Sequence, residues 1–134
     1  MPPRPLLPVL AAALALAAAL PAAAHHSFAM FDSGRTLTLN GTVKTFEWIN
    51  PHAVIWLAVG EAGDAEPVLW AIEMTSPGNL RREGWNRETL KPGDLVEAVV
   101  NPLRDGGPGG GFYSLKILAT GREFTRVRTT PPPE

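Results

Sequence analysis

Cysteine is absent from this chain of 134 residues, and neither sign of charge dominates it. Without cysteine the chain has no disulfide framework, no thiolate-bound zinc or iron–sulfur cluster and no thiol nucleophile. Lys and Arg number 12 against 13 Asp and Glu, so the positive excess that neutralises nucleic-acid phosphates is missing. A polybasic patch for anionic membranes is missing too. We therefore expect no nucleic-acid partner, and the length suits a single domain.

The first 24 residues have the three-part pattern of a secretory signal peptide. Arg4 supplies a positive start, an Ala- and Leu-rich run extends from Leu6 to Leu20, and small residues follow up to Ala24. The run is shorter than the ~20 residues of a membrane span, and Pro8 interrupts it. We therefore predict a signal peptide over residues 1–24, with an uncleaved anchor or a buried helix as the alternatives.

Cleavage near Ala24 would place the mature protein in the periplasm or outside the cell, with no membrane insertion afterwards. No cysteine follows the apolar run, so a lipoprotein anchor is excluded. Residues 25–40 lack a clear hydrophobic period, which is typical of an arm that leads into the first strand.

The mature chain reads mainly as β-strands. Residues 68–74 alternate strictly between apolar and other side chains, which predicts a strand with one core face. Ser76 and Pro77 are a helix-start signal, and Gly84 ends that helix. The predicted strands are Gly41–Ile49, Ala53–Val59, Val68–Met74, Leu95–Val100 and Phe112–Ala119.

Three strands, a short helix and two more strands is the order of an OB-fold. We therefore predict a mostly β protein: an OB-fold-like, five-stranded, partly open barrel over residues 41–124, with one short helix between strands 3 and 4. A flat α+β roll or a small sandwich is the alternative. Gly41 and the region of Glu47 would bend the long first strand. Gly106–Gly111 is predicted as a flexible connection, and residues 125–134 as a disordered tail.

His25 and His26 stand at the predicted mature terminus. If cleavage follows Ala24, the α-amine and ring of His25 can chelate one metal ion, and another imidazole completes a three-nitrogen site that suits copper. If cleavage follows Ala23, a histidine in third position can hold Cu(II) or Ni(II) in a square plane. The alternative is that the two histidines form only a soluble spacer.

His52 follows Asn50-Pro51 between the first two predicted strands. It could supply a third nitrogen ligand if the arm folds back over the barrel; otherwise it is a turn residue bonded to a nearby carbonyl. Asp32 and Glu73 are the acids expected nearest to this site. Met30 and Met74 could bind Cu(I), although Met74 lies on an apolar strand face and is expected in the core.

Four tryptophans occur in the chain. Trp70 lies on the apolar face of its strand and is expected to pack in the core. Trp85, just past Gly84, is the best candidate for an exposed tryptophan, which would suit a protein partner.

Several blocks of sequence occur in a specific order that covers the mature chain: AHHSFAMFD, GTVKTFEWINPH, a tryptophan-containing third strand, SPGNLRREGW and TLKPGDLVEA. With these blocks the chain resembles a family of short exported bacterial proteins that is described only as a domain of unknown function. The resemblance implies a signal peptide and a small β-rich domain, and it supplies no catalytic residue or cofactor.

No established enzyme motif is present, so we expect a non-enzymatic binding protein. The first hypothesis is a periplasmic module that binds copper through His25, His26 and His52. The alternative is a protein-interaction module that docks on a periplasmic or membrane partner. An exposed apolar patch around Trp85 or Trp48 would favour the second hypothesis.

Overall fold

The computed structural model describes residues 28–60 and 66–127. The chain is mostly β, with one short helix between the third and fourth strands, as predicted. Its elements are β1 (Leu37–Glu47), β2 (Val54–Val59), β3 (Val68–Glu73), α2 (Pro77–Arg82), β4 (Leu95–Pro102), β5 (Gly109–Ile117) and β6 (Glu123–Thr125).

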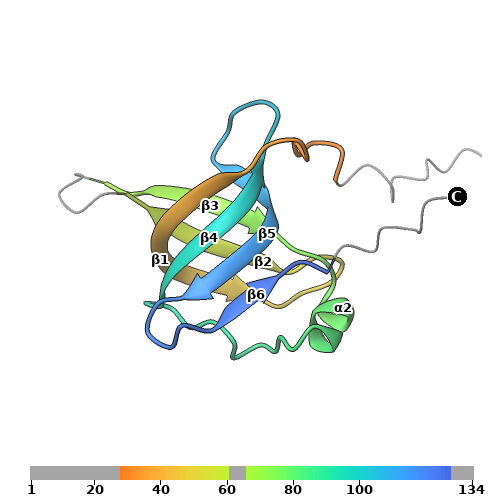
Figure 1. Ribbon diagram of the computed structural model, residues 1–134, viewed down its shortest axis with the longest axis vertical. Coiled ribbons are helices and arrows are strands. Elements are labelled where there is room, and N and C mark those ends of the chain that lie inside the picture. The colour runs from red at the N-terminus through yellow and green to blue at the C-terminus, as the bar shows by residue number, and fades with distance from the viewer. Residues whose placement is uncertain (1–27, 61–65, 128–134) are drawn as a thin grey trace, which may run out of the picture.

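The strands form a barrel with the OB-type order. Neighbours pair in the order β3-β2-β1-β4-β5-β6, and an additional parallel pairing of β3 with β5 closes five strands into a barrel (Figure 1). The short β6 pairs antiparallel with β5 outside the five-stranded ring. Closure leaves few strand edges exposed, which stabilises a barrel of such apolar strands against edge-to-edge association.

β1 is longer than predicted and serves two neighbours. It begins at Leu37, inside the segment predicted as an arm, and pairs with β4 before it pairs with β2. The pairing register with β2 shifts between Val43 and Thr45, so the bulge lies earlier than the predicted bend near Glu47. At Gly41 an added Cβ would lie 2.9 Å from Leu57 Cγ and closer still to the Ala58 carbonyl oxygen. A glycine is therefore needed at this point of the pairing of β1 with β2.

The prediction of a flexible connection was wrong for its second half. Gly109, Gly110 and Gly111 are the first residues of β5, and they are buried. A Cβ at Gly110 would lie 2.8 Å from the Asn101 carbonyl oxygen. β5 packs closely between β3 and β4 at this point, so missing side chains allow the barrel to close rather than making a loop flexible.

Trp85 is buried, with 2% of its surface exposed, and the prediction of an exposed tryptophan was wrong. Gly84 has a φ of 88°, and the Trp85 N–H donates to the Leu80 carbonyl at 2.9 Å, which turns the chain back under α2. The indole ring then packs against Phe124, with ring centroids 4.0 Å apart. Trp48 is also buried, at 6% exposure.

The predicted start of α2 is confirmed. Ser76 caps the helix by accepting from the Asn79 N–H, and Pro77 occupies the first turn. Over residues 28–60 and 66–127, no helix is long and apolar enough to cross a membrane.

Candidate functional site

His52 and Glu73 form a hydrogen-bonded pair. Nδ1 of His52 lies 2.5 Å from Oε1 of Glu73, and both side chains are about a quarter exposed, at 25% and 24%. The pairing of β2 with β3 brings them together, because hydrogen bonds from Ala53 to Thr75 and from Met74 to Ala53 extend it beyond Val54. His52 therefore lies beside the carboxyl end of β3.

This pair has the chemistry of an oriented metal ligand. A carboxylate that accepts from Nδ1–H fixes the ring orientation and keeps the lone pair on Nε2. It also increases the basicity of the ring as a ligand. The contact between His52 Nδ1 and Glu73 Oε1 is thus of the kind that orients metal-bound histidines in other proteins.

The arm reaches His52. The ring of Phe28 packs against the His52 ring, with centroids 5.5 Å apart. A turn follows, in which the Phe31 N–H donates to the Phe28 carbonyl at 3.2 Å, and the two phenylalanine rings lie 6.2 Å apart. The first described residue of the chain therefore lies on the candidate ligand.

His25 and His26, the other two predicted ligands, lie outside the described residues, so the structure does not test them. Within the described part of the chain, no group of three or more His, Cys, Asp and Glu could hold a metal ion. A site with three or more such ligands would thus include at least one residue from outside the described ranges.

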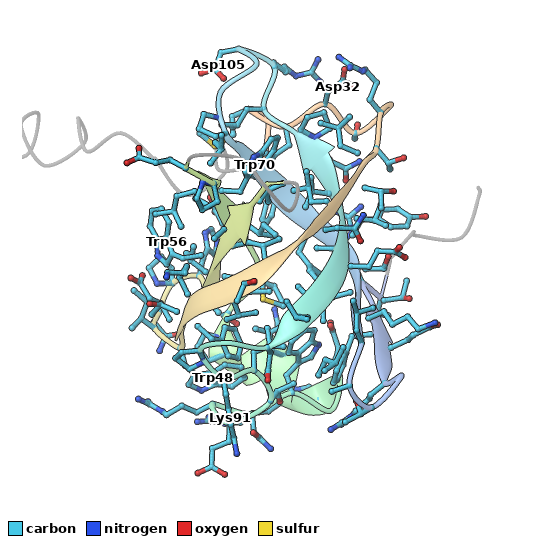
Figure 2. All side chains as sticks on the ribbon, turned by 90° about the vertical axis from the view of Figure 1, so that its left-hand side faces the viewer. Asp32, Trp48, Trp56, Trp70, Lys91 and Asp105 are labelled. Carbon is cyan, nitrogen blue, oxygen red and sulfur yellow. The ribbon has the colours of Figure 1, made fainter. Side chains whose placement is uncertain are left out.

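The remaining side chains named from the sequence make other contacts. Asp32 bonds the Gly34 N–H at 3.1 Å in a local turn, and Figure 2 shows it at the same end of the molecule as Asp105. Met74 is a buried core residue, as expected, whereas Met30 is half-exposed.

A small cavity adjoins the pair, and no pattern in the sequence predicts it. It measures about 40 Å³, and both Phe28 and Glu73 line it. Burial raises the pKa of Glu83 on another wall. The remaining lining residues are Met74, Thr75, Leu80, Phe112 and Arg126.

Fold and site together define a class: a small β-barrel protein of OB-type strand order with a carboxylate–histidine pair beneath its N-terminal arm. Residues 13–112 match the family of unknown function DUF6152, and the protein belongs to that family. This confirms the predicted resemblance to a family that is described only as a domain of unknown function. The chain matches none of the curated proteins with which it was compared.

Proposed function

We propose that this protein is an exported copper-binding module whose ligands are His25, His26 and His52. One observation supports the proposal above the others: the Phe28 ring packs on His52, whose Nδ1 is bonded to Glu73. The chain that carries two histidines thus enters the described structure at an oriented imidazole.

Chain geometry supports the same assignment. His26 precedes Phe28 by two residues, so their Cα atoms are at most about 7 Å apart, and those of His25 and Phe28 at most about 11 Å. At most three residues of chain thus separate either histidine from the contact of Phe28 with His52. Copper(II) is the natural first test, since it stands at the top of the divalent affinity order for nitrogen ligands.

The cleavage site decides which geometry forms. Cleavage after Ala24 gives His25 a free α-amine, and the amine and ring of His25 join further imidazoles from His26 and His52. Cleavage after Ala23 allows a square-planar site made of the amine, two backbone amides and the His26 ring. Only the first arrangement uses His52.

Native mass spectrometry tests this proposal on protein exported by its own signal peptide, with and without one equivalent of Cu(II). We expect a chain that starts at His25 and holds one copper ion, which His25→Ala or His52→Ala releases. A start at Ala24 with copper lost only in His26→Ala indicates the square-planar site. No retained copper with either start rejects the metal function.

The alternative, a protein-interaction module, relied on an exposed patch around Trp85 or Trp48. Both side chains are buried, at 2% and 6% exposure. That observation takes away the surface on which the alternative was based, so metal binding is the function that we put forward.

A further inference from the structure

The segment before β1 is docked on the end of β4. The Asp32 N–H donates to the Pro102 carbonyl at 2.8 Å, and the Arg104 N–H donates to the Met30 carbonyl at 2.9 Å. Between these bonds Phe31 forms an antiparallel bridge with Leu103. Figure 1 shows this segment in orange, beside the loop that joins β4 to β5. Residues 28–35, which we call the strap, thus add a short pairing to the barrel.

Two side chains fasten the strap at its ends. Arg104 Nε donates to the Ala29 carbonyl at 3.1 Å, next to Phe28. Asn101 Nδ2 donates to the Arg35 carbonyl at 2.7 Å, and Asn101 is buried at 3% exposure. Because buried amides are costly unless they are bonded, the Asn101 contact strongly favours the docked strap.

Gly111 leaves the space that the Phe31 ring of the strap occupies. A Cβ at this position would meet the Phe31 ring at 3.0 Å, and its three nearest atoms all belong to that ring. Phe31 is itself buried, at 6% exposure. Gly111 is also the register partner of Glu73 in the β3–β5 pairing. The contact of Gly111 with Phe31 therefore lies directly beside Glu73, the residue that is bonded to His52.

We infer that Arg104 and Gly111 are positioning residues: they dock the strap so that Phe28 lies on His52, the proposed metal ligand. This role rests on the proposed function for its consequence in metal binding. The docking itself needs no metal. A docked strap lowers the ordering entropy that a chelate must otherwise overcome, which raises affinity without adding a ligand.

The first test measures docking in the metal-free protein. The NMR signals of the His52 ring protons report the nearby Phe28 ring, and Phe28→Ala gives their undocked positions. We expect Gly111→Ala and Arg104→Ala to move these signals toward the Phe28→Ala positions. Gly78→Ala is the matched control, because a Cβ at Gly78 meets nothing closer than 3.9 Å. Unchanged His52 signals in Arg104→Ala, which alters no strand residue, overturn the inference.

The second test measures Cu(II) affinity in the same variants. We expect one copper ion per chain in each, with a Kd about tenfold weaker for Gly111→Ala and Arg104→Ala than for Gly78→Ala, as for other groups that orient ligands. An unchanged Kd overturns the positioning role, since the copper is then held without the strap. If the wild type binds no copper, the proposed function fails, whereas the His52 signals still decide whether these residues dock the strap.

Discussion

Glu73 and His52 are bonded Oε1 to Nδ1 across the extended pairing of β2 with β3, at 2.5 Å. The two residues are far apart in sequence. The pairing register of β2 with β3 brings their side chains together. Phe28 then covers the imidazole from a third part of the chain. Three segments therefore meet at one ring, which makes this pair the natural centre for testing.

Glu73→Gln should weaken Cu(II) binding about tenfold, because a carboxylate that contacts a ligating histidine holds the ring in its binding orientation. Isothermal titration calorimetry of the exported protein measures the effect. Glu97→Gln, an exposed carboxylate on β4, is the matched control and should bind as the wild type does. Equal Kd values for the two variants would show that Glu73 does not act on the metal ligand.

The strands were predictable where alternation is strong. β2 and β3 lie within one residue of their predicted bounds at every end, because β3 alternates with the period of a strand and β2 is an apolar run of strand length between turn residues. β5 was predicted to begin at Phe112 but begins at Gly109. Glycines carry no strand signal, so a strand that needs close backbone approach looks like a loop in sequence.

The candidate site was only partly predictable. The position of His52 in a turn and the short distance of Phe28 from two histidines were visible in the sequence. Glu73 was expected among the acids nearest this site, but its bond to His52 was not predicted, because pairing registers follow from the whole sheet. The contact of Phe31 with Gly111 could not be predicted for the same reason. The need for a glycine at this position is evident only once Phe31 is placed against it.

Trp85→Ala should lower the free energy of unfolding by about 3–5 kcal/mol, since a fully buried aromatic is replaced by a cavity. Urea unfolding followed by circular dichroism measures this change. Trp56→Ala is the control: Trp56 is half-buried, its neighbours Ile55 and Leu57 take the core positions, and Figure 2 shows it at the side of the barrel. We expect a smaller loss for Trp56→Ala, and the reverse order would contradict the packing described for α2.

Gly41→Ala should destabilise the barrel by about 1–3 kcal/mol, the range typical of overpacking. The new methyl group would meet the Ala58 carbonyl, which is backbone and cannot rotate away. Gly78→Ala in α2 has open space and should be neutral or slightly stabilising. Equal unfolding free energies for the two variants would mean that Gly41 in β1 does not lie as close to β2 as described.

Glu83→Gln should stabilise the protein more at pH 7 than at pH 4. Burial raises the pKa of Glu83 above its usual 4.5, so the folded state binds more protons than the unfolded one between the two pKa values. The stability from this group is complete below the unfolded pKa and is lost as the pH rises through the folded pKa. Glutamine carries no charge at either pH, so the variant does not lose this part of the free energy of unfolding as the pH rises. Urea unfolding at both pH values, with the exposed Glu88→Gln as control, measures it, and an advantage independent of pH would contradict the burial of Glu83.

Copper affinity should fall steeply in acid, because protons compete with copper for every proposed nitrogen ligand. In model peptides a histidine side chain titrates at about 6.5 and an α-amine at about 7.7–8.0, so Kd should rise as the pH falls from 8 to about 5. Acetylation of the amine removes that ligand and should abolish tight binding at all these pH values. If the acetylated protein binds copper as the free amine does, the N-terminus is no ligand, and the imidazoles alone must account for the site.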